Sequence, residues 1–96
     1  MLRTKSLSTT YIAAVRLVDG TDHEHIVELI WINENTLKSG KTSTAGMVEF
    51  IKKGNSVKVS DGRRRVKLHV VDAESPYIRA QVDGEWTDDL LALPRY

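Results

Sequence analysis

The sequence contains no cysteine. This absence excludes a disulfide scaffold, a thiolate metal site and a cysteine nucleophile, and it suits a reducing compartment. No apolar run approaches the ~20 residues that a membrane-spanning helix needs, so we expect no membrane partner. An excess of one charge is also lacking, because the formal net charge is only +1. We therefore expect a cytoplasmic protein whose partners are indicated by local charge rather than by overall charge.

The length of 96 residues and the apolar content of 41% fit one domain that folds unaided. Residues 1–10 include Arg3 and Lys5 but no apolar central segment, so we expect that they are not a secretory signal. We expect these residues to form a flexible N-terminal arm. Residues 11–96 would then form a single domain.

One helix is predicted over residues 45–53. Apolar residues recur there at helical spacing, and hydroxyl side chains precede them as candidate N-caps. Gly54 follows as a residue able to end the helix in the left-handed conformation.

Five segments have the composition and turn signals of strands. They are residues 11–18, 26–32, 56–60, 63–71 and 77–82. The fold class predicted from them is α+β: a single antiparallel sheet of about five strands, in the order β-β-α-β-β-β, with one helix packed on it. Leu90, Leu91 and Leu93 are expected to dock a C-terminal tail on the core.

The segment 26–32 is almost continuously apolar, which indicates a strand covered on both faces or a strand at an oligomer contact. One helix rarely covers a five-stranded sheet. We therefore expect the tail, a second copy, or both to complete the cover, and a homodimer is one predicted assembly.

Several segments carry a family resemblance. They are Ile26-Val-Glu-Leu-Ile-Trp31, Asn35-Thr-Leu-Lys-Ser-Gly40, Val48-Glu-Phe-Ile-Lys-Lys53, Asp61-Gly62, Pro76-Tyr-Ile-Arg79 and Asp83-Gly-Glu-Trp-Thr-Asp-Asp-Leu-Leu-Ala-Leu-Pro-Arg-Tyr96. Over residues 11–96 the chain resembles DUF3892, a family of small bacterial proteins of unknown function. The resemblance implies a short bacterial or phage-borne cytoplasmic protein, and it transfers no catalytic residue, cofactor or substrate.

Two positions depart from the pattern that this resemblance implies. Leu37 stands where the family usually has glycine, and leucine would resist a positive φ and expose an apolar side chain. Gly46 stands where the family tends to have glutamate, so a capping box with Ser43 is lost.

The dipeptide Asp61-Gly62 predicts a hairpin with a two-residue loop. In that register Lys58 lies opposite Arg65, and alternation places the cations on one face and the valines and leucine on the other. The predicted polar face carries Lys58, Arg63, Arg65, Lys67, His69, Tyr77 and Arg79. We expect this basic face to bind an anionic partner, either nucleic acid or an acidic protein surface. The alternative is a solvated sheet face or a charged edge that prevents aggregation.

Other candidate sites are weaker. His23 and His25 would point the same way on a strand, as two metal ligands could. The one candidate for a third ligand is His69, if its strand is adjacent, and a polar connection is favoured. No nucleophile elbow and no glycine-rich phosphate loop are present, so we expect no enzyme activity and no cofactor. Trp86 and Tyr96 are candidates for a protein interface. They support an alternative function as a phage-borne or accessory interaction module that inhibits a host or defence complex.

Overall fold

The computed structural model describes residues 9–60 and 65–96, and strands dominate these two ranges. The elements are β1 (Thr10–Leu17), a short 3₁₀ helix η2 (His23–His25), β2 (Ile26–Asn33), β3 (Ser39–Ser43), α1 (Thr44–Lys52), β4 (Val57–Ser60), β5 (Arg65–Val71), β6 (Tyr77–Val82) and β7 (Glu85–Thr87). The expected arm lies outside the described residues as far as residue 8, and Thr10 is the first residue of β1.

The strands of the described chain form one mixed sheet in the order β3-β2-β1-β4-β5-β6-β7. Most neighbours are antiparallel hairpin partners, but β1 and β4 are parallel and meet through Thr10 opposite Val57 and Tyr11 opposite Lys58. The predicted antiparallel sheet of about five strands is therefore wrong. The parallel pair joins strands that are far apart in the sequence, and no local turn signal can indicate such a contact.

The sequence analysis also missed two short strands, β3 and β7. In β3, the sequence Ser-Gly-Lys-Thr-Ser offers no apolar alternation, yet its backbone completes the ladder of β2. β7 follows β6 through Asp83-Gly84, where both residues have positive φ, of 51° and 84°. Positive φ at both central residues is the requirement of a type I′ hairpin turn. The sequence interpretation used Asp83-Gly84 only to end a strand.

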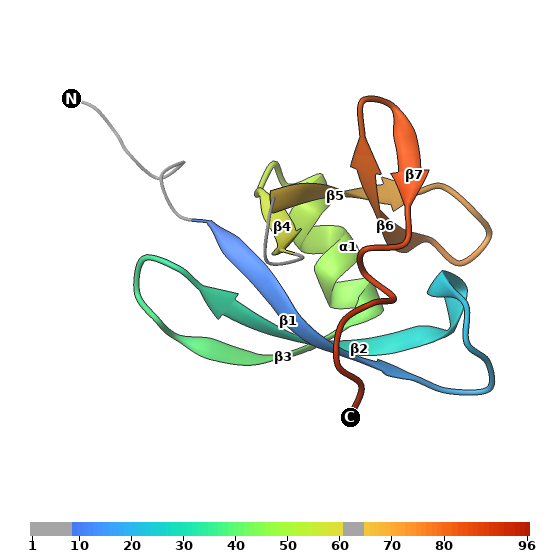
Figure 1. Cartoon of the computed structure of the whole chain (residues 1–96), viewed down its shortest axis with the longest axis horizontal. Helices are drawn as coiled ribbons and strands as arrows, with labels where there is room; N and C mark the ends of the chain where they lie inside the picture. The colour runs from blue at the N-terminus through green and yellow to red at the C-terminus, as the bar shows by residue number, and fades with distance from the viewer. Residues whose placement is uncertain (1–8, 61–64) are drawn as a thin grey trace.

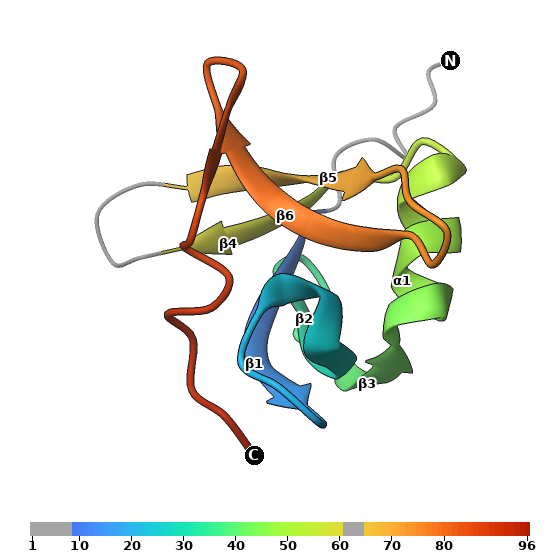
Figure 2. The ribbon, with the colours of Figure 1, turned by 90° about the vertical axis from the view of Figure 1, so that its right-hand side faces the viewer.

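The helix begins and ends within one residue of its prediction. Ser43 is the N-cap, and its Oγ accepts a hydrogen bond from the backbone N–H of Gly46 at 3.0 Å. Gly54 follows the helix with φ of 99°, which confirms the predicted left-handed stop. Figures 1 and 2 show α1 lying between β1–β2–β3 and β4–β5–β6, against which Met47 and Val48 are buried.

The C-terminal tail docks on the core as predicted, without forming a helix. Leu90 is fully buried, and Leu91 and Leu93 pack against the buried cluster. Beyond the point where β1 pairs with β4, the tail pairs with β1: the N–H of Val15 donates to the carbonyl of Pro94 at 3.0 Å. The tail therefore takes the place of β4 as the hydrogen-bonded neighbour of β1 farther along that strand (Figure 1).

The strand β2 has a neighbour on each side, β3 and β1, but its two faces are not covered along its whole length. Ile26 and Leu29 are buried, whereas Val27 is 42% and Ile32 is 37% exposed. Complete cover on both faces is therefore not observed, and a homodimer at this strand stays a prediction. In the described residues, no helix is both long enough and apolar enough to cross a membrane.

Candidate functional site

The hairpin of β4 and β5 separates charged from apolar side chains. Val66 and Leu68 are buried, whereas Arg65 and Lys67 are exposed, which is the alternation predicted from the sequence. The register differs by two residues: Ser60 pairs with Arg65, and Lys58 pairs with Lys67 rather than with Arg65.

The predicted two-residue loop is therefore wrong, because residues 61–64 separate the paired strands. Arg63, and the turn itself, lie outside the described residues. The physical reason is core packing: the observed register pairs Val59 with Val66, both buried, where a two-residue loop would have placed Arg64 opposite Val59. Because a shift of two residues preserves the alternation, every described cation keeps its predicted face.

The centre of this polar face is a pair of like charges. Lys58 and Lys67 occupy directly opposite positions in the antiparallel pair, and Tyr11 stands beside Lys58 on β1. Among residues 9–60 and 65–96, no carboxylate forms an ion pair with either lysine. Like charges placed opposite each other destabilise a strand pair.

The two arginines of the face that the structure describes are each paired with a carboxylate and stacked on an aromatic ring. Arg65 Nη2 lies 3.2 Å from Glu34 Oε2, and its guanidinium lies 5.2 Å from the ring centre of Tyr11. Arg79 Nη2 lies 3.1 Å from Asp88 Oδ1, and its guanidinium lies 5.8 Å from the ring centre of Trp86. These ion pairs remove much of the positive charge that the sequence alone suggests.

The remaining predicted residues lie toward the other end of β5 and β6. His69 pairs with Arg79, and Tyr77 pairs with Val71. Trp86 lies opposite Gln81 and is 42% exposed. The sequence interpretation chose Tyr77 as the aromatic of this face, but the rings that contact its arginines are Tyr11 and Trp86.

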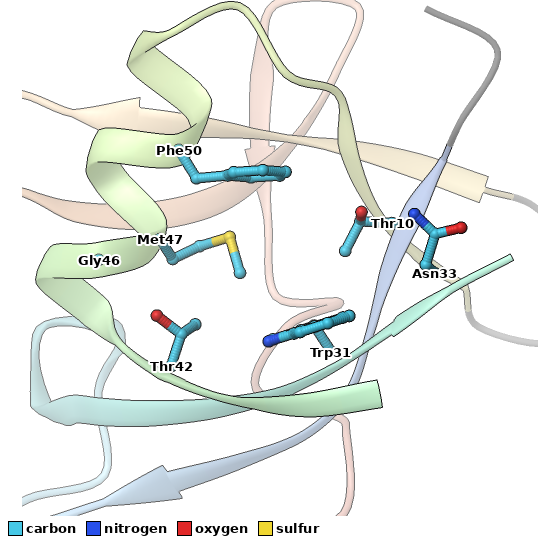
Figure 3. A pocket seen from close by; sticks show the side chains of 7 residues that line it. All are labelled: Thr10, Trp31, Asn33, Thr42, Gly46, Met47 and Phe50. Carbon is cyan, nitrogen blue, oxygen red and sulfur yellow. The ribbon is translucent and has the colours of Figure 1, made fainter. Parts of the chain in front are cut away.

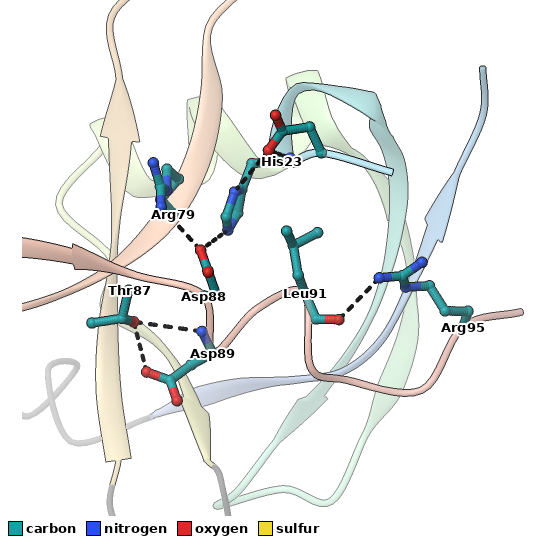
Figure 4. Close-up of polar contacts among 8 residues, drawn as sticks. His23, Arg79, Thr87, Asp88, Asp89, Leu91 and Arg95 are labelled. Carbon is teal, nitrogen blue, oxygen red and sulfur yellow. Dashed lines mark hydrogen bonds and ion pairs between the residues drawn. The ribbon is translucent and has the colours of Figure 1, made fainter. Parts of the chain in front are cut away.

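A buried histidine links the 3₁₀ helix to this face (Figure 4). His23 is 3% exposed, and its Nε2 lies 3.8 Å from Asp88 Oδ1, the same oxygen that accepts from Arg79. Burial, and then the positive charge of Arg79, lower the pKa of His23 below 6.5. Its backbone N–H donates to the Asp22 carboxylate, which lowers the pKa of Asp22. The bridging position of Asp88 was not predicted from the sequence.

The two histidine side chains make different contacts in the structure. His25 Nδ1 accepts a hydrogen bond from the Asp22 backbone N–H, and its ring lies against Gly20, where a side chain would not fit. His23 instead points into the molecule toward Asp88. Within the described parts of the chain, no three His, Asp or Glu side chains are grouped to hold a metal ion. The expectation of no enzyme activity stays a prediction.

Tyr96, the other interface candidate, is 41% exposed and lies at the end of the tail that pairs with β1. Its hydroxyl donates to Glu28 on β2, and Lys41 Nζ lies 5.6 Å from its ring centre. These contacts secure the tail, and they leave its expected role in a protein interface as a prediction.

The chain matches a known protein family. The family model described as "Protein of unknown function (DUF3892)" matches residues 11–94 of the 96-residue chain, so the chain belongs to this family. No curated protein and no solved structure matches the chain.

Proposed function

We propose that this member of a family without an assigned activity is a binding module that holds an anionic partner, nucleic acid, on the polar face of β4–β7. The observation that carries the proposal is the pair of Lys58 and Lys67, which lie directly opposite each other in the sheet. A phosphate placed between their ammonium groups would offset their mutual repulsion. The pair thus has an energetic reason to bind an anion that scattered surface lysines lack.

The stacked arginines support the same partner in a different way. Arg65 and Arg79 are already neutralised by Glu34 and Asp88, so they contribute less to phosphate attraction. Their stacking instead holds two rings on the face: Tyr11 beside Lys58, and Trp86 on β7, two strands away from Lys67 on β5. An aromatic ring on a basic sheet face offers a surface on which a base can stack, worth about 1–3 kcal/mol per base. Trp86 is the better platform because it is 42% exposed.

With only the two lysines contacting phosphate, the affinity for nucleic acid should depend modestly on salt concentration. If the two lysines neutralise about two phosphates, log K should fall with log salt with a slope near −1.4 on a single strand. A face on which every predicted cation contacted phosphate would give a slope several times steeper. The salt slope therefore reports how many of the cations take part.

The test is a fluorescence anisotropy titration with labelled single-stranded DNA, single-stranded RNA and duplex DNA at several salt concentrations. We expect binding at low salt that is lost in Lys58→Glu/Lys67→Glu. The matched control is Lys52→Glu/Lys53→Glu, which makes the same charge change at the end of α1 and should bind as wild type. Absence of binding at low salt, or an equal loss in both double variants, would contradict the proposal.

A second comparison separates nucleic acid from an acidic protein surface. Poly-glutamate with the same number of charges as the oligonucleotide should compete weakly, since it has no bases to stack. Trp86→Ala should weaken oligonucleotide binding about tenfold and leave poly-glutamate binding unchanged. Equal binding of both polymers, with no effect of Trp86→Ala, would favour the acidic protein surface.

A further inference from the structure

A cavity of about 310 Å³ lies on the opposite side of the sheet from the basic face, between α1 and the strands β1–β2–β3 (Figure 3). Its walls are Thr10, Trp31, Asn33, Thr42, Gly46, Met47 and Phe50. This volume is at the lower end of the roughly 300–1,000 Å³ typical of small-molecule sites. It suits a molecule of one or two rings.

Two aromatic side chains bound the cavity from opposite sides. Figure 3 shows the rings of Phe50, from α1, and Trp31, from β2, both nearly edge-on across the open space, with Met47 along one wall. The indole packs closely against Gly40 of β3, where a Cβ would lie 2.9 Å from the Trp31 ring. A flat molecule in this space would have an aromatic ring on either side of it.

One edge of the cavity presents an oriented hydrogen-bond donor. Asn33 Oδ1 accepts from the backbone N–H groups of Asn35 and Thr36 at 2.9 and 3.0 Å. These two bonds fix the amide, and Figure 3 shows its nitrogen turned toward the cavity beside Thr10. The amide nitrogen and the Thr10 hydroxyl make no hydrogen bond to any other described residue.

Charge is absent from these walls. None of the described residues that line the cavity is ionisable. A charged ligand would lose its hydration there without gaining an ion pair, which is costly, whereas a neutral ligand would not.

We propose that this cavity binds an uncharged, planar aromatic or heteroaromatic molecule between Trp31 and Phe50, with an acceptor on its edge that accepts from Asn33 Nδ2. The inference does not depend on the lysine pair. Loss of oligonucleotide binding would leave it unaffected, and the reverse also holds.

The test uses three small probes and the fluorescence of Trp31. The chain has two tryptophans, so the Trp86→Phe variant makes Trp31 the sole reporter. Benzamide has both the ring and the acceptor, cyclohexanecarboxamide has the acceptor without the flat ring, and toluene has the ring without the acceptor. We expect benzamide to change Trp31 fluorescence in a saturable manner, and each of the other probes to bind at least tenfold more weakly.

Two variants examine the walls. Asn33→Asp keeps the oxygen that accepts from the backbone and replaces the amide donor with a second oxygen, so benzamide should bind at least tenfold more weakly while the turn stays intact. Phe50→Leu keeps an apolar wall without a ring and should also weaken binding. Tyr77→Leu, which makes a comparable change outside the cavity, should not.

Amide shifts in NMR spectra of the labelled protein give an independent readout and show whether each variant is folded. Shifts confined to the residues that line the cavity would support the proposal. It would be overturned if no planar probe produced a fluorescence change or these shifts up to its solubility limit. It would also be overturned if benzamide bound Asn33→Asp and Phe50→Leu as tightly as the wild type.

Discussion

The hydroxyl of Tyr96 donates a hydrogen bond to Oε1 of Glu28 at 2.8 Å, joining residues 68 positions apart. The Tyr96 backbone N–H also donates to the carbonyl of Val15 at 3.3 Å. Together these bonds attach the tail to β1 and β2. The tail is thus part of the domain, and its contribution to stability can be measured.

We expect Tyr96→Phe to lower the free energy of unfolding by about 0.5–1.5 kcal/mol at neutral pH, because it deletes one hydrogen bond to a carboxylate. Urea unfolding followed by circular dichroism measures this change. Tyr77→Phe is the matched control, since the described residues give the Tyr77 hydroxyl no hydrogen-bond partner. An equal effect of the two substitutions would show that the Tyr96–Glu28 bond does not stabilise the tail.

The same tyrosine predicts a loss of stability at high pH. Partial burial of the phenol, and then its hydrogen bond to Glu28, raise the pKa of Tyr96 from 10.0 to about 12. Since the folded-state pKa lies above the unfolded one, this contribution is complete below pH 10 and is lost as the pH rises toward about 12. Wild type should therefore lose more stability than Tyr96→Phe between pH 9 and pH 11.5, a difference that unfolding at both pH values measures.

His23 predicts a loss of stability at low pH. Its neutral imidazole is buried against Asp22, Asp88 and Arg79, and the net effect of burial and of Arg79 is a pKa below 6.5. Because the folded-state pKa is the lower one, the stabilising contribution is complete above pH 6.5 and falls as the pH drops below that value.

Replacing His23 with glutamine removes this proton uptake and should flatten the decline between pH 7 and pH 5. Unfolding midpoints at four pH values measure the slope. His69→Gln serves as the control, because His69 lies on the polar face of β5 and is only partly buried. A decline as steep in His23→Gln as in wild type would assign the acid sensitivity to other groups.

We expect replacement of Leu37 by glycine to stabilise the protein. Leu37 has φ of 61° and is 79% exposed, so its side chain gains little burial while its backbone occupies the left-handed region. That conformation costs an L-residue roughly 1–2 kcal/mol. After the entropy cost of glycine, Leu37→Gly should raise the free energy of unfolding by about 0.5–1 kcal/mol. Leu37→Ala, which keeps a Cβ, should show no such gain in the same urea titration.

We expect the effect of replacing Gly46 on stability to depend on the side chain at position 42. A Cβ at this position would lie 2.5 Å from the Thr42 Oγ1, which occupies the space beside the first helical turn. Gly46→Ala alone should therefore gain nothing, although alanine favours a helix by about 1 kcal/mol. In a Thr42→Ala background the same change should stabilise the protein by up to about 1 kcal/mol. Additive effects in this double-mutant cycle would show that Thr42 is not the obstacle.

The sequence by itself determined the local elements. The helix, its Ser43 cap and its Gly54 stop follow from signals that lie within a few residues of one another. The alternation in β5 and β6 also determined which side chains face the core, and the observed register preserved that division. The family was likewise predicted from short motifs, and its model matches residues 11–94.

Tertiary structure decided what depends on contacts between distant segments. The parallel pairing of β1 with β4 and the polar edge strand β3 depend on neighbours that supply a backbone ladder, not on the strand's own composition. The net charge of the basic face also depends on contacts between distant segments. Arg65 and Arg79 are cations in the sequence, but Glu34 and Asp88 neutralise them in the fold, which leaves Lys58 and Lys67 as the opposed pair at its centre.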